Sequence, residues 1–475
     1  RDPRRHRRTG GRRRVVDRGQ GPRDRPDRRR SRDSLRRSRH RPAHPCGECV
    51  MTGALWTALD AATAAGGRLT EGGWTATGVS IDTRTLEPGD LFVALTDQRD
   101  GHDFAQDALK KGAAAVMVSN PDCAAGPRLV VDDVLTGLRR LGEGARLRSA
   151  AVRVGVTGSV GKTGVKEALA AIFRAAGRAH WSEKSYNNHW GVPLTLSRMP
   201  ADTERAVFEM GMNHAGEITD LVSMVRPHVA LITKIAPAHL ENLGSMEAIA
   251  DAKAEIFSGL ADDGVAVIPA DDEFAPRLMD AVAVSRAAFL IDFGWSPKAA
   301  VRVLSYEDGP DGGAGALDLM GRRLDFRLRL TGMHQAVNAA GALAAAFAAG
   351  VDPDLALDAL SQLEPVAGRG ASFEARLPGG RAVTVVDESY NANPASMAAA
   401  LTSLKARAPQ RGGRRIAFLG EMLELGPDSA ALHASLAGPV EDAGAELVIV
   451  VGQGAKRLAE ALEGRVETVW ARECG

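Results

Sequence analysis

The sequence predicts an α/β protein of three domains with largely parallel sheets. Its 475 residues suffice for about three domains of roughly 150 residues each. Short apolar runs alternate with helical segments along most of the chain, and such alternation is typical of parallel sheets with helices on both faces. Hydrophobic residues make up 44% and charged residues 25% of the chain, as expected of a globular protein.

The first 50 residues differ in composition from the rest. Residues 1–41 contain 19 Arg and 5 Asp, with almost no apolar residues to build a core. An arm that binds nucleic acid is one interpretation of such a run. We expect instead a disordered extension that is not native, with the natural start at Met51 and no nucleic-acid partner. The run lacks the apolar segment of a secretory signal.

Residues 51–150 are predicted to form a small N-terminal α/β domain. Leu55, Trp56 and Leu59 follow helical spacing directly after Met51. A strand over Leu91–Leu95, a helix over Phe104–Lys111 and a strand over Ala115–Val118 are expected next.

Residues 151–366 are predicted to form a central domain and residues 367–475 a Rossmann-like third domain. The central domain is expected to hold strands at Val152–Thr157, Ala206–Glu209, Val229–Thr233 and Val265–Pro269, and helices at Lys162–Ala176 and His334–Ala349. Strands of the third domain are expected at Ala382–Val386, Arg415–Leu419 and Leu447–Val451. Ligands bind at the carboxyl ends of such strands. That rule selects Gly158, Glu209, Lys234, Asp387 and Gly420.

Composition also limits location and partners. No apolar run reaches the roughly 18 residues of a membrane-spanning helix. Four cysteines in so long a chain do not make a disulfide framework, which fits a reducing compartment. Cys46 and Cys49 form a lone CxxC pair, and a structural zinc site needs four ligands. We therefore expect a cytoplasmic monomer without membrane insertion.

The segment from Gly155 to Thr163 is the clearest chemical signal. It joins an apolar strand to a helix, and its glycines let backbone N–H groups point at phosphate oxygens. Lys162 is placed to reach the β and γ phosphates, and the Thr163 hydroxyl to bind Mg²⁺. The strict GxxxxGK[ST] spacing fails at Val156, which leaves a GxxGKT core. A chance Gly-rich turn is the alternative explanation, and the loop alone does not separate a GTPase, motor, kinase or ligase.

Four further residues are candidates for the same site. Glu209 ends a strand and suits Mg²⁺, although an ordinary solvated acid is the alternative. His239 follows the end of another strand, where a structural histidine is equally reasonable. Taken alone, Lys253 on its predicted helix would be a surface lysine. Asn338 interrupts an Ala-rich helix, where a buried amide needs a partner, either a nucleotide base or a helix neighbour.

The motifs, taken in order, resemble those of the Mur ligase family over about residues 51–470. Thr157–Thr163 is similar to the family's phosphate loop TG(T/S)xGKT. The other matching segments are Ser80–Arg84, Pro88–Leu95, Asn187–Pro193, Glu209–Ile218, Asp387–Pro394 and Leu419–Gly426. The segments EMGMNHAGEI and SYNANP favour the member that adds D-alanyl-D-alanine over its relatives.

The resemblance implies ATP and Mg²⁺ as cofactors and assigns roles to single residues. ATP would be held by the loop residues Gly158, Ser159, Val160, Gly161, Lys162, Thr163 and Gly164, with Asn338, Arg369, Asp387 and Tyr390. Magnesium would be held by Thr163, Glu209, His239 and a carbamylated Lys253. The catalytic group would comprise Lys162, His239, Lys253 and Arg369. UDP-N-acetylmuramoyl-tripeptide and D-alanyl-D-alanine would be bound by Ser80, Asp82, Arg84, Asn187, Asn188, Asn391 and Asn393.

Three departures from the family pattern stand out. Gly164 replaces the usual Ser or Thr, and Glu388 and Glu421 replace Asp. The chain stops at Gly475 without the family's further KGS-type strand, so a truncated third domain is one interpretation and an altered reading frame is another. The expected reaction runs through an acyl phosphate. The alternatives are a sister Mur ligase, a folylpolyglutamate-type ligase, or a P-loop NTPase that is not a ligase.

Overall fold

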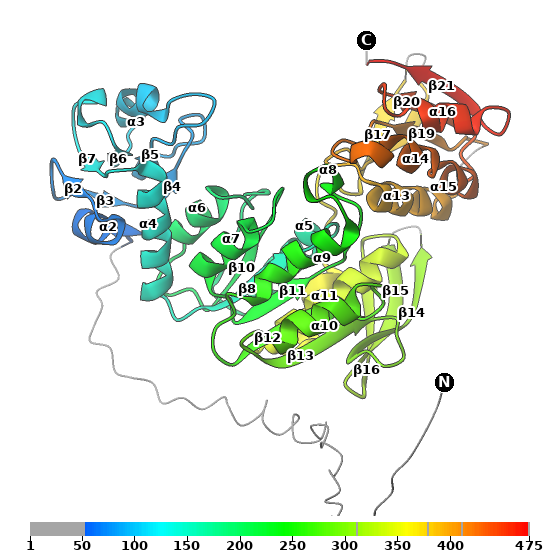
Figure 1. Ribbon diagram of the computed structural model, residues 1–475, viewed down its shortest axis with the longest axis horizontal. Helices are drawn as coiled ribbons and strands as arrows, with labels where there is room; N and C mark the ends of the chain where they lie inside the picture. The colour runs from blue at the N-terminus through cyan, green and yellow to red at the C-terminus, as the bar shows by residue number, and fades with distance from the viewer. Residues whose placement is uncertain (1–52, 310–311, 378–379, 410–411, 474–475) are drawn as a thin grey trace, which may run out of the picture. The chain divides into compact units, whose positions relative to one another are not determined.

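The computed structural model describes residues 53–309, 312–377, 380–409 and 412–473 (Figure 1). The described residues from Ala54 onward form one compact unit. The expectations for residues 1–50, Met51, Cys46 and Cys49 lie outside the described residues. Within the described residues, no helix is long and apolar enough to span a membrane.

The first part of this unit contains a five-stranded sheet in the order β2-β7-β6-β5-β4. All pairings in it are parallel except that of β2 with β7. The strands are β2 (Arg68–Leu69), β4 (Gly78–Ser80), β5 (Asp90–Val93), β6 (Ala115–Val118) and β7 (Arg128–Val130), and the helices are α2 (Ala58–Ala65), α3 (Ala105–Lys110) and α4 (Val134–Arg148). The small α/β architecture expected for this region is confirmed.

The helix expected to include Leu55, Trp56 and Leu59 is placed wrongly. Trp56 lies in a short strand, β1 (Trp56–Thr57), which pairs with β3 (Thr75–Ala76). The helix α2 begins only at Ala58, because the Thr57 side chain accepts a hydrogen bond from the Asp60 N–H and caps it. Leu59 is consequently turned toward solvent and is 71% exposed.

The central sheet has nine strands in the order β16-β15-β14-β13-β12-β11-β8-β10-β9. Its parallel part comprises β8 (Val152–Thr157), β9 (Ala179–Trp181), β10 (Arg205–Glu209), β11 (Val229–Ile232), β12 (Gly264–Pro269) and β13 (Ala287–Gly294). The strand β8 lies between β10 and β11 and pairs parallel with both. The carboxyl ends of these three strands therefore meet at one edge, as the sequence predicted.

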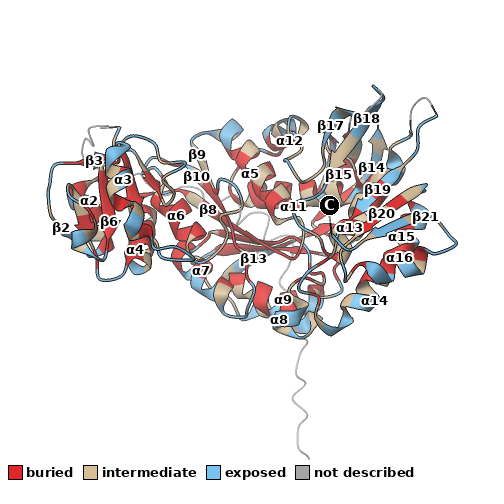
Figure 2. Cartoon of the chain, turned by 90° about the horizontal axis from the view of Figure 1, so that it is seen from above, coloured by how far each residue is buried: buried red, intermediate tan, exposed pale blue. Residues whose placement is uncertain are grey.

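Helices cover both faces of this sheet (Figures 1 and 2). One apolar core joins the sheet to α5 (Lys162–Ala176), α11 (Met333–Ala348) and α12 (Pro353–Ser361). A second core joins the opposite face to α6 (Gly191–Ser197), α7 (Glu217–Val225), α9 (Met246–Ala254) and α10 (Ala275–Ala283). The doubly covered parallel sheet is thus confirmed.

Residues 301–328 depart from the expected strand–helix alternation. They form β14 (Val301–Gly309), β15 (Gly312–Leu319) and β16 (Arg322–Leu328), which pair antiparallel to one another. Buried and exposed residues alternate along β16, which is typical of an antiparallel strand with one solvated face. A tight turn through Gly321, at φ 92°, connects β15 to β16 directly.

The last part of the chain contains two sheets. An antiparallel pair, β17 (Ala371–Arg376) and β18 (Ala382–Asp387), precedes a parallel sheet of β19 (Ile416–Leu419), β20 (Leu447–Val451) and β21 (Glu467–Ala471). The associated helices are α13 (Pro394–Ala406), α14 (Ser429–Ala434), α15 (Ala437–Asp442) and α16 (Lys456–Leu462). The expected strand at Ala382 is therefore present, but in the antiparallel pair and not in the parallel sheet.

Candidate active site

The phosphate-loop segment connects β8 to α5, and its glycines are required by its geometry. Gly158 has φ 146°, and a Cβ there would lie 1.9 Å from the Thr233 hydroxyl oxygen. Gly161, at φ 83°, directly precedes α5. The Ser159 N–H donates to the Lys234 carbonyl at 2.8 Å, and Thr233 donates to the Val160 carbonyl at 2.5 Å. The loop is therefore fixed against the end of β11, with α5 starting at its end.

Lys162 is half-buried and lies over this loop. Its Nζ donates to the Gly158 carbonyl at 2.7 Å. Burial lowers the pKa of Lys162, the Glu209 carboxylate opposes that shift, and the charge of Arg369 adds to it. The ammonium thus lies among the backbone groups of the loop, where a triphosphate would offer it stronger partners.

Glu209 is buried at the carboxyl end of β10 and uses both carboxylate oxygens. The Thr163 hydroxyl donates to Oε2 at 2.9 Å, and Asn187 Nδ2 donates to Oε1 at 2.8 Å. The structure therefore brings Thr163 and Glu209 together, as expected for a shared magnesium site. Asn187, which is expected to face the sugar substrate, also contacts the carboxylate of this pair.

His239 lies before the short helix α8 (Leu240–Leu243), with a left-handed backbone at φ 58°. Its Nδ1 is 2.5 Å from Glu424 Oε2, and the Glu241 N–H donates to the Glu424 carbonyl at 3.2 Å. Burial lowers the pKa of His239, and the Glu424 carboxylate opposes that shift. Sequence reasoning missed Glu424 as a partner, although its motif was identified.

Lys253 is buried on α9 and is only 1% exposed, so the surface position expected for an isolated lysine is wrong. Burial, reinforced by the charge of Lys162, holds the pKa of Lys253 well below its usual value. A neutral amine is the nucleophilic form of a lysine. Burial of Lys253 therefore increases the share of this neutral form.

The third-domain candidates surround one backbone turn. Asp387 accepts from the Gly368 N–H at 3.1 Å and from the Ser389 hydroxyl at 2.6 Å, and the latter bond lowers the Asp387 pKa most. The guanidinium of Arg369 lies 4.1 Å from the centre of the Tyr390 ring, within cation–π range. Asp387, Arg369 and Tyr390 are thus neighbours.

Several predicted binding residues have local structural partners. The Asn338 side chain lies close to Gly161, where an added Cβ would approach its Oδ1 to 2.8 Å, so it borders the phosphate loop. Asn188 Oδ1 accepts from the Gly191 N–H at the start of α6. Asn393 caps α13 through a reciprocal pair with Ser396. Gly164 faces open space.

The other predicted substrate residues differ in exposure. Asn391 is exposed, and its own side chain accepts from the Ala392 N–H. Ser80 is buried at the end of β4, and its hydroxyl donates to the Asp82 carbonyl at 3.1 Å. Asp82 forms a 2.7 Å ion pair with the exposed Arg84, which lowers its pKa.

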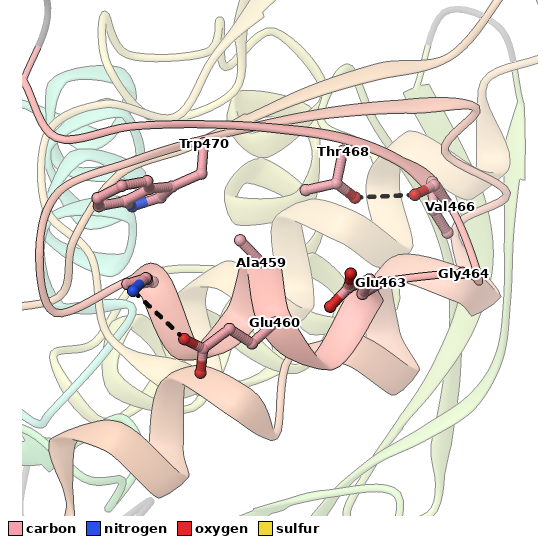
Figure 3. A pocket seen from close by; sticks show the side chains of 8 residues that line it. Ala459, Glu460, Glu463, Gly464, Val466, Thr468 and Trp470 are labelled. Atoms are coloured by element: carbon pink, nitrogen blue, oxygen red, sulfur yellow. Dashed lines mark hydrogen bonds and ion pairs between the residues drawn. The ribbon is translucent and has the colours of Figure 1, made fainter.

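The described residues contain no cluster of three or more His, Cys, Asp or Glu side chains suited to a metal. The oxygen donors of Glu209 and Thr163 are nonetheless of the kind that Mg²⁺ prefers. An open pocket of about 360 Å³ between α16 and β21 (Figure 3) is lined by Lys456, Glu460 and Trp470, among others. None of the predicted site residues lines it.

Comparison with known proteins matches three segments of the chain to one family. Residues 75–146 match the catalytic domain of the Mur ligase family, residues 156–346 the Mur ligase middle domain, and residues 375–473 the Mur ligase, glutamate ligase domain. The chain is 36% identical to UDP-N-acetylmuramoyl-tripeptide--D-alanyl-D-alanine ligase of Escherichia coli, over 81% of this chain and 83% of that protein. It is 35% identical to the Bacillus subtilis enzyme of that name, over 75% and 76%.

Solved structures agree with these matches. MurF from Acinetobacter baumannii superposes with a TM-score of 0.76 at 30% identity, covering 87% of this chain and 89% of that one. MurF from Thermotoga maritima, solved with ADP, gives a TM-score of 0.67 at 25% identity, covering 83% and 93%. Together, the family matches, the relatives and the solved structures show that the chain belongs to the Mur ligase family.

Proposed function

We propose that the chain is an ATP-dependent, ADP-forming ligase that joins D-alanyl-D-alanine to UDP-N-acetylmuramoyl-tripeptide in peptidoglycan precursor synthesis. The observation that carries this proposal is the phosphate loop at the end of β8, with the Thr163 hydroxyl on the buried Glu209 carboxylate. The names of the most similar relatives supply the substrates. ATP use agrees with the relative solved with ADP.

The reaction joins a carboxylate to an amine in two steps. The terminal carboxylate of the tripeptide attacks the γ-phosphorus of ATP, ADP leaves, and an acyl phosphate forms. The amine of D-alanyl-D-alanine then attacks the acyl carbon, phosphate leaves, and the amine loses a proton. Lys162 and Arg369 stabilise the charge that develops on the phosphoryl oxygens, which is the main means of catalysis in such transfers.

Magnesium binding is part of the proposal. Thr163 and Glu209 would hold the ion, together with His239 and a carbamylated Lys253. The ion supplies positive charge next to the phosphate oxygens when bound. Carbamylation has a physical purpose here, because a protonated Lys253 would repel the ion whereas a carbamate attracts it.

The other proposed roles are divided among the three domains. Residues 51–150, through Ser80, Asp82 and Arg84, would bind the UDP-sugar, residues 151–366 would bind ATP, and residues 367–475 would supply Arg369. Asp387, Tyr390, Asn391 and Asn393 would complete the nucleotide and dipeptide side. Because Arg369 and Lys162 belong to different domains, domain closure would assemble the site. The enzyme would act as a cytoplasmic monomer.

A direct assay tests this proposal. The chain is incubated with ATP, Mg²⁺, UDP-N-acetylmuramoyl-tripeptide and D-alanyl-D-alanine, and products are identified by mass together with released phosphate. Ligated product and ADP are expected in equal amounts. A panel of other amines separates sister ligases, because a different preferred amine would contradict the assignment. ATP hydrolysis that needs no amine would indicate an NTPase instead.

A further inference from the structure

Lys166 is a buried cation that neither the phosphate loop nor the metal site explains. It lies on α5, one turn after Lys162, and its side chain is fully buried. Burying an ammonium is costly unless it is paired and hydrogen-bonded. The partners of Lys166 therefore show what the charge is for.

Two partners of Lys166 lie in the segment of residues 182–188, between β9 and α6. Lys166 Nζ donates to the Ser182 carbonyl at 2.9 Å and to the Lys184 carbonyl at 3.3 Å, and it also pairs with the Glu167 carboxylate. Two of its bonds thus clamp one turn of backbone. Lys184 has a left-handed backbone at φ 52°, an unfavourable conformation for a non-glycine residue that neighbouring contacts must hold.

The segment of residues 182–188 links the residues proposed to bind the UDP-sugar with those proposed to hold magnesium. At one end, Glu183 pairs with Arg198 at 3.4 Å, and Arg198 donates to the Val79 carbonyl of β4 at 2.6 Å. The charge of Lys184 also contributes to the low pKa of Asp82. At the other end, Asn187 donates to Glu209. A shift of the 182–188 segment would therefore disturb both its contact with β4 and the hydrogen bond to Glu209.

We infer that Lys166 is a positioning residue. By fixing the segment of residues 182–188, it holds the UDP-sugar substrate in the correct position relative to the Glu209 carboxylate. This inference rests on the proposed function. Lys166 touches neither reacting group, so its loss should weaken binding of UDP-N-acetylmuramoyl-tripeptide more than binding of ATP. Loss of a hydrogen bond donated by a charged group is expected to weaken the affinity for this substrate about tenfold.

A matched control separates positioning from general stability. Arg153 is also a buried cation of the central domain, 8% exposed, and donates to the carbonyls of Val225 at 2.8 Å and Arg226 at 3.1 Å. It lies near the opposite end of β8 from the phosphate loop. Arg153→Met should therefore cost stability without changing the KM of the UDP-substrate.

The test compares steady-state constants of the full chain with those of Lys166→Met, Lys166→Arg and Arg153→Met. For Lys166→Met we expect the KM of the UDP-substrate to rise about tenfold, with the KM of ATP changed less than about threefold. Lys166→Arg, which keeps donors for both carbonyls, should restore most of the affinity. If Lys166→Met is not recovered folded, Lys166→Gln decides by the same criterion.

An unchanged KM of the UDP-substrate in the folded Lys166 variant would overturn this inference. An equal rise in Arg153→Met would also overturn it, because the effect would then be one of stability alone. Absence of product from the unchanged chain would overturn the proposed function and this inference together. Product from the unchanged chain with unaltered constants in Lys166→Met would overturn this inference alone.

Discussion

The central sheet and the C-terminal parallel sheet share strand type but differ in how they are covered. Apolar cores lie on both faces of the central sheet. In the sheet of β19, β20 and β21, Ala417, Leu419 and Val448 enter a core with the helices, whereas Phe418 on the other face is 73% exposed. The difference matters for the site, because Thr163, Glu209 and Lys253 are buried in the doubly covered region.

Two candidate residues of the third domain are open to solvent, Tyr390 at 53% exposed and Asn391, whereas Asn393 is buried where it caps α13. Preorganised charges are most effective where packing excludes water and fixes their position. We therefore expect the central region to carry most of the catalytic effect and the third domain to contribute through closure.

The largest expected effect is the loss of Lys162. Lys162→Ala should lower kcat by about a thousandfold or more, since it removes a charge directed at the transferred phosphoryl group. Tyr390→Ala should lower kcat far less, because the residue is 53% exposed and its ring lies against the Arg369 guanidinium rather than in the phosphate loop. Both are measured by product formation under saturating substrates. Comparable losses of kcat in the two variants would contradict the proposed difference between the central region and the third domain.

Core substitutions should show the same contrast in stability. Phe173 is fully buried in the core between α5 and the central sheet, and Phe173→Ala should cost about 3–5 kcal/mol. Phe418→Ala, on the uncovered face of the C-terminal sheet, should change stability by no more than about 0.5 kcal/mol. Urea unfolding followed by fluorescence and circular dichroism measures both. A large loss in Phe418→Ala would mean that this face is covered in solution.

Acid sensitivity should arise in the central region. Burial lowers the pKa of His180 to about 4, and its Nε2 lies 2.7 Å from the Thr195 carbonyl. The unfolded chain binds the proton more readily, so stability falls as the pH falls from about 6.5 to about 4. The loss at pH 5 is about 2 kcal/mol.

His180→Gln should remove this part of the pH dependence. Unfolding is compared at pH 7.5 and pH 5, with the exposed His214→Gln as the control. The difference between the two pH values should shrink in the first variant and not in the second. An unchanged difference in His180→Gln would show that other groups control acid stability.

The parallel strands could be predicted from sequence because they are continuous apolar runs. The bounds of β8, β6 and β20 are those predicted, and the carboxyl-end rule selected Gly158 and Glu209, which follow or end the neighbouring strands β8 and β10. The antiparallel strand β15 was missed, because its Gly- and Ala-rich sequence has a weak strand preference. Its pairing depends on neighbours and not on its own residues.

Contacts between distant segments were the other limit. Glu424 is 185 residues from His239 in the sequence, and no local pattern connects them. Lys166 lies in a regular helix, and the two carbonyls that it binds belong to an irregular segment without periodicity, so no sequence pattern indicates the contact. Burial of Lys253 was likewise hidden, since its helix is otherwise regular. Local propensity predicts elements, but the partners of buried charges depend on tertiary packing.

A small effect on catalysis is expected at the contact between the two regions, which His239 and Glu424 form. The Glu424 side chain is 48% exposed, and an ion pair open to solvent is worth about 0.2–1 kcal/mol. Glu424→Gln should therefore lower kcat/KM by no more than about fivefold. His239→Gln should lower kcat/KM more, because this substitution also removes a proposed magnesium ligand. The variant should therefore need a higher Mg²⁺ concentration. Titrating Mg²⁺ in both variants distinguishes the two roles. An equally large loss of kcat/KM in Glu424→Gln would show that the third domain positions His239 directly. The proposed difference between the central region and the third domain would then not hold at this contact.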